Sequence, residues 1–375
     1  MPDLTVSLVN WNTRALLEKC IQSVLDSVES ITVEIIVIDN ASEDGSVDMV
    51  RSQFPQVQLI ANDDNVGFTR ANNQSIAIAT GRHYILLNSD TYVLPGALDR
   101  MVQYLDEHPD AGAVSARTWL DDDQTLELAS LPPLGPIAIF CASSDLFRRW
   151  TPLGQFHRTN REIWRGEDDV DVDAIVGACF MVRRAVLHEI GPLDEGMFMY
   201  FEDADWSQRI RHLGLRLVVV KDAHIIHYHD KSGSNNPRKH QIFEASMTHW
   251  FRRIYGLPGL AVFGAAMKVK APIDRIFRAI KRRTFPAPEA TPMSTTAPAL
   301  HWPKIPGAHS YLVEIGLDPA FAALAGRYVT TNALDLAPLA TPDTLGTYFH
   351  WRIFGLRADG SMITGPSGSF TPVHP

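Results

Sequence analysis

The chain has 375 residues, of which 45% are hydrophobic and 21% charged, a composition typical of a globular protein whose length favours two domains. The formal net charge of −9 excludes general nucleic-acid binding, which needs a basic face. No apolar run approaches the roughly 18 residues of a membrane span. Residues 1–11 lack a signal-peptide pattern, and the three cysteines are scattered. We therefore expect a reduced, cytoplasmic protein.

Strand-like and helical patterns alternate over the first 116 residues. Strands are expected at residues 5–11, 33–39, 57–61, 84–88 and 111–116, and helices at 14–27, 45–54, 69–79 and 95–107. This alternation predicts an α/β fold with a mostly parallel central sheet, covered by helices on both faces. Most of these strands end in polar residues, at the sheet edge where ligands bind in open α/β folds.

The pattern after residue 116 is mixed. A hairpin-like stretch at 118–128 precedes a loop rich in Pro and Gly, a strand-turn-helix unit at 172–213 and another strand at 215–220. A histidine-rich stretch follows at 223–234. We interpret these segments as the second half of one domain, residues 1–255.

Three further regions follow this domain. Residues 256–285 form a basic segment in which apolar residues recur at helical spacing, so it either lies on an anionic membrane surface or packs as a solvated helix against the first domain. Residues 286–298 form a Pro-rich linker. Residues 299–375 carry alternating segments with Pro and Gly between them, which predict a small all-β sandwich.

Three acidic clusters compete as a metal site: residues 88–90 (Asn-Ser-Asp), 121–123 and 169–173. Mg²⁺ takes oxygen ligands and usually only one or two protein carboxylates. The cluster at 121–123 lies between two strand-like pieces, where acids favour a hairpin turn, and that at 169–173 alternates with Val as on an exposed strand. The cluster at 88–90 follows a wholly apolar strand, so its position favours it.

A second acidic site lies in the stretch FMYFEDADW, where a helix is expected to begin at about Asp203. Acids at a helix start often cap its first amides, and this alternative applies most to Glu202 and Asp205. A carboxylate at the rim of an aromatic pocket is also placed to take a proton from a hydroxyl, which favours Asp203 as a base. The aromatic residues expected to stack a sugar are Tyr200, Phe201 and Trp206.

Histidines 224, 227 and 229 form a third cluster. Their spacing is not that of a zinc site without cysteines nearby, and a histidine after a strand is more often structural. If an acidic metal site lies elsewhere in the chain, one of these histidines could serve as an additional metal ligand.

The order of the motifs VSLVNWN, IIVIDNASEDGS, NVGFTRANN, YILLNSDT, VGACFMVRR, GPLDEGMFMYFEDADW and HIIHYHDKSGS resembles that of family 2 glycosyltransferases of the GT-A fold, especially a bacterial subgroup of rhamnosyl- and galactofuranosyltransferases. The resemblance covers roughly residues 3–255. It implies inverting transfer of a sugar from a nucleotide diphosphate donor, dTDP or UDP favoured, to a glycan or lipid-linked acceptor in surface polysaccharide synthesis. The expected location is the cytoplasm, with peripheral contact at the inner face of the membrane.

The resemblance also implies residue roles. Asp90 would hold Mg²⁺ or Mn²⁺ against the donor diphosphate, His227 would complete the metal shell, and Asp203 would be the base beside Glu202. Nucleotide-sugar contacts would come from Trp11, Asn12, Asp39, Asn40, Asn65, Gly67, Arg70, Asn73 and Asn88. Asn88 replaces the first acid of the family's DxD motif, which leaves Asp90 as its one carboxylate. The last segment resembles a fibronectin type III-like domain with Trp302, Tyr311 and Trp351 in its core.

Two other functions are weighed against this one. A sugar nucleotidyltransferase has a related fold, but it would carry a Gly-rich basic loop after the first strand, and WNTRALLEK does not supply one. A non-catalytic glycan-binding or scaffold protein could keep a degenerate transferase domain. The presence of both Asp90 and Asp203 argues against that alternative.

Overall fold

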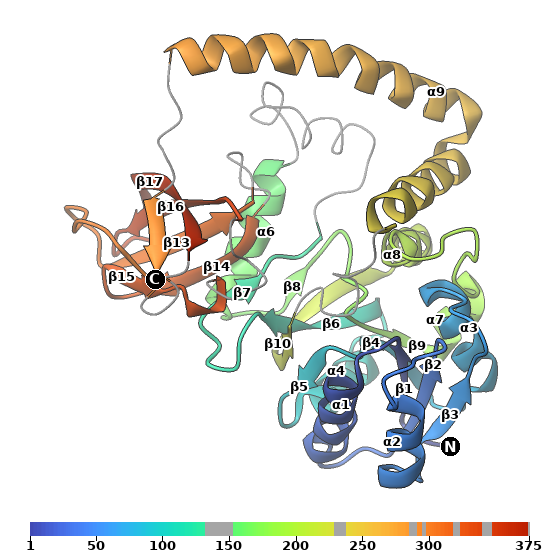
Figure 1. Ribbon diagram of the computed structural model, residues 1–375. Coiled ribbons are helices and arrows are strands. Elements are labelled where there is room, and N and C mark those ends of the chain that lie inside the picture. Colours follow the sequence, from blue (N-terminus) through green and yellow to red (C-terminus); the bar gives the residue numbers. More distant parts are fainter. Residues whose placement is uncertain are drawn as a thin grey trace. The chain divides into compact units, whose positions relative to one another are not determined.

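The computed structural model describes residues 1–131, 153–228, 238–284, 291–294, 298–317, 323–339 and 347–373 (Figure 1). The chain divides into two compact units. The first comprises Met1–Thr118 and Gly166–Val262, and the second comprises Trp119–Arg165 and Phe263–Pro375. The described residues 119–131 and 153–165 therefore group by their contacts with the C-terminal region, whereas the domain expected from the sequence spans residues 1–255.

A mixed sheet with a parallel centre forms the first unit (Figure 1). Four strands pair in parallel in the order β4-β1-β2-β3: β1 (Leu4–Asn10), β2 (Val33–Asp39), β3 (Gln58–Ala61) and β4 (His83–Asn88). Next to β4 lie β9 (Cys179–Arg183), which runs antiparallel, and then β6 (Ala111–Trp119). Strand β10 (Arg216–His227) pairs with β6 and, antiparallel, with β5 (Thr91–Val93) and β8 (Val170–Asp171).

Helices cover both faces of this sheet because β1 alternates in polarity. Leu4, Val6 and Leu8 share one buried core with Leu17 and Ile21 of helix α1 (Arg14–Ser27). The opposite face carries Ser7, whose hydroxyl donates to Asn72 Oδ1 at 2.9 Å in helix α3 (Phe68–Ile78). The other helices of this unit are α2 (Ser46–Gln53), α4 (Ala97–Glu107), α7 (Arg184–Ile190) and α8 (Glu202–His212). The expected architecture is confirmed.

The second unit is rich in strands. One sheet has the order β11-β17-β16-β13-β14-β7 and a second pairs β12 with β15. Their bounds are β7 (Glu127–Leu128), β11 (Thr291–Ser294), β12 (Ala299–His301), β13 (Ser310–Gly316), β14 (Ala323–Val329), β15 (Ala333–Asp335), β16 (Phe349–Leu356) and β17 (Met362–Val373). A short 3-10 helix, η2, spans Ala337–Leu339. Trp302 and Tyr311 lie in the core, and Trp351 packs partly buried against it. The fibronectin type III-like assignment stays a prediction.

Residues from the middle of the chain complete this unit. Leu126 lies in its core, and β7 pairs with β14. Helix α6 (Leu153–Arg165) brings Arg161, whose Nε donates to the buried Glu314 carboxylate at 2.9 Å, and Arg352 also pairs with Glu314. Two guanidinium groups thus neutralise one buried carboxylate, which compensates for its loss of water.

The acidic cluster at 121–123 lies in a turn between two strands, as its position in the sequence predicts. Asp121 accepts hydrogen bonds from the backbone amides of Thr125 and Leu126, which close the turn before β7. The predicted linker at 286–298 contains a strand, because β11 pairs in parallel with β17. Residues 286–290 and 295–297 of that linker and the Pro/Gly loop at 132–152 lie outside the described residues.

A long helix, α9 (Lys239–Thr284), includes the predicted basic segment. Gly256 has non-helical dihedral angles (φ 66°, ψ −175°), so two helical stretches meet there. The side chains from residue 269 to 297 lie outside the described residues, so the basic amphipathic face stays a prediction. Within the part of the chain that is described, no helix combines the length and apolarity needed to cross a membrane.

Candidate active site

A cavity of about 300 Å³ opens at the carboxyl ends of β1 and β4. The sequence-predicted residues that line it are Trp11, Asn40, Asn65, Asn88, Asp90, Tyr200, Glu202, Asp203 and His227. These residues come from six separate segments of the chain. The cavity therefore joins the predicted metal, donor and base residues at one place.

The parallel register explains why the first of these residues meet. Asn10 lies opposite Asp39, and Val9 lies opposite Asn88, so β1, β2 and β4 end at the same level. Their following residues then project from one edge of the sheet, as is usual for ligand sites of open α/β folds.

Asp90 and His227 form the candidate metal pair. The antiparallel register of β5 and β10 places His227 opposite Thr91, and the Tyr228 amide donates to the Asp90 carbonyl at 3.0 Å. His227 Nε2 lies 3.2 Å from Asp90 Oδ1 and 3.4 Å from Asn88 Nδ2. Among the described residues no group of three or more His, Cys, Asp or Glu is placed to hold a metal ion. A divalent cation here would therefore take its other ligands from phosphate and water, which Mg²⁺ commonly does.

A strained turn presents the acidic pair. Tyr200 (φ 75°) and Phe201 (φ 70°) both adopt the left-handed conformation, which L residues with side chains rarely occupy, and α8 begins directly after them at Glu202. Such a conformation costs about 1–3 kcal/mol per residue and persists only where the surroundings enforce it. The turn brings Glu202 and Asp203 to the cavity wall.

The two carboxyl groups have different surroundings. Asp203 accepts hydrogen bonds from the amide of Gly177 at 2.9 Å and from that of Ala204 at 2.8 Å. Burial raises the pKa of Asp203, and these amides oppose the rise. Glu202 is buried and its Oε2 has no hydrogen-bond partner among the described residues. Burial, together with the neighbouring Asp203 charge, raises the pKa of Glu202 to about 8, so this side chain is mainly a neutral acid at pH 7.

The aromatic residues of the acidic motif divide between cavity and core. Tyr200 lines the cavity, whereas Phe201 is buried against Phe243 and Trp250. Trp206 is fully buried and packs edge-on against Phe180 at a centroid distance of 5.7 Å. The prediction of Phe201 and Trp206 as walls of the sugar pocket is therefore wrong, because both rings face hydrophobic neighbours inside the fold.

Two predicted donor contacts, Asp39 and Asn12, are not among the residues that line the cavity. Asp39 is buried and accepts hydrogen bonds from Asn10 Nδ2 and the Ser42 amide, both at 2.8 Å. Asn12 accepts a hydrogen bond from the Glu43 amide at 2.8 Å. Both side chains organise the loops after β1 and β2, and their contact with a nucleotide stays a prediction.

Within the segment from Gly67 to Asn73, Phe68 lines the cavity, but the three predicted donor residues Gly67, Arg70 and Asn73 do not. Gly67 has φ 89°, and an added Cβ would lie 2.7 Å from the Phe198 ring, so glycine is needed there for close packing. Arg70 is exposed and forms a surface ion pair with Glu195 at 3.2 Å, and its contact with the nucleotide-sugar stays a prediction. Asn73 bonds both backbone groups of Leu193 at 2.9 Å, so it holds a loop.

The lining also includes Ser89 of the 88–90 cluster and Phe198 of the aromatic motif. The lining residues that the sequence reasoning missed are Val9, Phe68, Val176, Gly177, Ala178, Met199 and Lys239. The Gly177 amide binds Asp203, and the small residues of the VGAC stretch are a signal for such close backbone approach. Lys239 follows a region with no periodic pattern, so its place on the cavity wall had no signal in the sequence.

This arrangement defines the class of protein. A mostly parallel sheet with polar residues at its carboxyl ends, facing a helix that starts with two carboxyl groups, is the GT-A fold of nucleotide-sugar transferases. The fold is shared with a solved structure, GalNAc-T7 with UDP, GalNAc and Mn²⁺, at a TM-score of 0.51 and 14% identity, covering 97% of this chain and 69% of that one. Residues 5–191 match the model of glycosyl transferase family 2, so the chain carries a domain of that family.

Two curated relatives refine the similarity. An N-acetylglucosaminyl-diphospho-decaprenol L-rhamnosyltransferase of Mycobacterium tuberculosis is 26% identical over 262 residues, covering 66% of this chain and 83% of the relative. The succinoglycan biosynthesis protein ExoO of Rhizobium meliloti is 36% identical over 159 residues, covering 40% of this chain and 44% of the relative. The homologues thus include proteins of polysaccharide biosynthesis.

Proposed function

We propose that the protein is an inverting glycosyltransferase that moves a sugar from a nucleotide diphosphate donor to an acceptor hydroxyl. The observation that carries this proposal is that one cavity is lined by Asp90 and His227 as well as by Asp203. A donor diphosphate at the first pair would place its sugar toward the second side. An acceptor hydroxyl near Asp203 could then attack the face opposite the departing nucleotide.

The charge of the cavity supports the use of a divalent metal. Its lining carries the carboxyl groups of Asp90 and Asp203 beside the neutral Glu202, and a diphosphate would add further negative charge. Lys239 supplies one positive charge among the described lining residues. Mg²⁺ or Mn²⁺ held by Asp90 and His227 would offset this repulsion and stabilise the charge that develops on the leaving nucleotide.

Asp203 is the proposed base. Two backbone amides fix its carboxylate, and a raised pKa increases its affinity for the proton of the acceptor hydroxyl. Glu202, kept neutral beside it, would donate a hydrogen bond to a sugar or acceptor oxygen through Oε2. The two neighbouring carboxyl groups thus take different roles because their environments differ.

The substrate class rests on the relatives. The name of the mycobacterial relative describes rhamnosyl transfer to a decaprenol-linked acceptor, which supports a rhamnosyl-like donor sugar and a glycan or lipid-linked acceptor. For the donor nucleotide we propose dTDP or UDP, as the family resemblance implies. The basic segment at 256–285 would bring the enzyme to a lipid-linked acceptor at the inner face of the membrane. Surface polysaccharide synthesis is the proposed process.

The test is nucleotide release from a panel of dTDP-, UDP- and GDP-sugars with lipid-linked and free glycan acceptors. We expect release from at least one donor with Mg²⁺ or Mn²⁺, and its loss on chelation. Asp203→Asn should lower the rate by about 10²–10⁴-fold, the usual contribution of a general base. Asp123→Asn, which changes an exposed acid of the 121–126 turn, is the matched control and should keep full activity.

Two results would contradict the proposal. If no donor releases nucleotide with any acceptor class, the chain is a binding protein with a transferase fold. If transfer is found but Asp203→Asn retains the full rate, the assignment of the base is wrong while the transferase function stands.

A further inference from the structure

The first part of α9, residues 239–255, contacts the loop that leads to the acidic motif. This loop, residues 191–201 between α7 and α8, carries the lining residues Phe198, Met199 and Tyr200. Ser246 of α9 donates its hydroxyl to the Met199 carbonyl at 2.8 Å. His249 Nε2 lies 3.0 Å from Asp194 Oδ2. Helix α9 therefore binds the loop at Asp194 and again at Met199.

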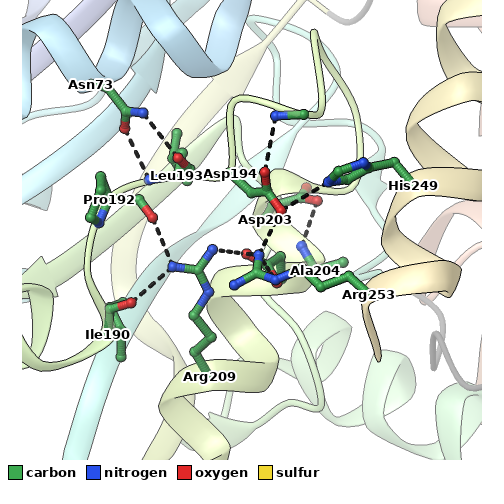
Figure 2. Close-up of polar contacts among 12 residues, drawn as sticks. Asn73, Ile190, Pro192, Leu193, Asp194, Asp203, Ala204, Arg209, His249 and Arg253 are labelled. Carbon is green, nitrogen blue, oxygen red and sulfur yellow. Dashed lines mark hydrogen bonds and ion pairs between the residues drawn. The ribbon is translucent and has the colours of Figure 1, made fainter. Parts of the chain in front are cut away.

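Arg253 links this loop to α8. Its NH1 group donates to Asp194 Oδ2 at 2.9 Å (Figure 2). The same group donates to Asp205 Oδ2 at 2.9 Å. Asp205 is fully buried and has one other ion-pair partner among the described residues, Arg209 of its own helix. Without the Arg253 guanidinium, a buried carboxylate would lose half of its compensating charge.

Other groups hold the first half of the same loop. Arg209 donates to the carbonyl groups of Ile190 at 2.8 Å and Pro192 at 2.7 Å, and Asn73 bonds both backbone groups of Leu193 (Figure 2). The contacts of Arg209 end at residue 192. Helix α3 also anchors the second half of the loop: Arg70 pairs with Glu195 at 3.2 Å, the Thr69 hydroxyl donates to the Met197 carbonyl, and the Phe68 amide donates to the Phe198 carbonyl at 2.8 Å. Both α3 and α9 therefore hold the second half of the loop, and the contacts of Asp194 come from His249 and Arg253 of α9.

The second half of the loop is the strained part. The left-handed turn at Tyr200 and Phe201 needs surroundings that enforce it. Phe243 of α9 packs against both rings, at centroid distances of 5.6 and 5.2 Å, and Trp250 packs against Phe201 at 5.8 Å. Asp203 follows this turn by two residues, so the orientation of its side chain depends on the contacts that fix the turn.

We propose that Arg253 is a positioning residue, which through Asp194 and Asp205 holds the 194–201 loop and α8 so that Asp203 faces the acceptor hydroxyl. This inference rests on the proposed transferase function. It assigns a role to a residue that the sequence places in a basic stretch, where Arg252 and Arg253 look equivalent. Both side chains are exposed, but Arg253 pairs with Asp194 and with the buried Asp205, and these ion pairs distinguish it from Arg252.

The test compares Arg253→Ala, Arg253→Lys and the matched control Arg252→Ala in the full-length chain. With the donor and acceptor found for the wild type, Arg253→Ala should lower kcat by about tenfold or more, since small misplacements of a reacting group have effects of this size. The KM for the donor should change by less than about twofold, because the metal pair and donor wall are untouched. Arg253→Lys should recover part of kcat, and Arg252→Ala should match the wild type.

Hydrogen exchange provides a measurement that does not need activity. In Arg253→Ala, amides of residues 194–205 should exchange at least about tenfold faster, while those of residues 4–10 keep their wild-type rates. A wild-type kcat in Arg253→Ala, or faster exchange across the whole first unit, overturns the positioning role. If the wild type transfers no sugar, the proposed function fails. The exchange rates of residues 194–205 in Arg253→Ala then decide by themselves whether Arg253 anchors the loop.

Discussion

Replacing Glu202 by Gln tests whether this side chain is buried as a neutral acid. Gln has nearly the same size and keeps a hydrogen-bond donor, but it never ionises. In the wild type, the pKa of Glu202 rises to about 8 from an ordinary value of 4.5, mainly because of burial and secondarily because of Asp203. The substitution therefore removes one titration and leaves the packing of α8 in place.

The sign follows from proton binding. Between pH 4.5 and about 8, the folded protein keeps a proton on Glu202 that the unfolded chain releases. Stability consequently falls as pH rises through this window and changes no further above it. At 1.36 kcal/mol per pKa unit, the whole window corresponds to about 5 kcal/mol, and the part between about pH 5.5 and 8 to about 3 kcal/mol.

The assay is urea-induced unfolding, followed by tryptophan fluorescence, of wild type and Glu202→Gln across this pH range. Other groups also titrate, so the relevant quantity is the difference in the free energy of unfolding between variant and wild type. We expect that difference to shift by about 3 kcal/mol in favour of the variant from about pH 5.5 to 8. Glu189→Gln, an exposed acid of α7, should show no such shift. A pH-independent difference for Glu202→Gln would refute the buried neutral acid.

Two further substitutions test the packing of each unit. Gly67→Ala places a Cβ 2.7 Å from the Phe198 ring at φ 89°, so it should lower stability by about 2–4 kcal/mol in thermal unfolding. Gly191→Ala, at φ 75° with nothing within 4 Å of the added Cβ, should lose only about 1–2 kcal/mol, and equal losses would contradict the clash. Glu314→Gln leaves two guanidinium groups around a neutral side chain, so we expect a loss of about 3–5 kcal/mol by urea unfolding. An unchanged midpoint would mean that this ion cluster contributes little to the second unit.

Local patterns in the sequence were enough to predict the helices and strands of the first unit and the site residues at the carboxyl ends of its parallel strands. Leu4, Val6 and Leu8 alternate with Ser7 along β1. This two-residue alternation indicates a strand, because successive side chains of a strand point to opposite faces of the sheet. Asn88 and Asp90 follow an apolar strand, and parallel strands end at the same edge of a sheet. Residues that depend only on the direction of their own strand can be placed from sequence in this way.

Tertiary structure decided the contacts between distant segments. His227 reaches Asp90 because β10 pairs with β5 across more than a hundred residues, and no local period encodes that pairing. Trp206 and Tyr200 belong to the same aromatic motif, yet one enters the core and the other the cavity, since the neighbours of each ring come from other elements. Arg253 differs from Arg252 for the same reason. The sequence by itself determined which residues lie on a strand or helix. Only packing decided which of them share a site, because the environment of a side chain depends on elements that are remote along the chain.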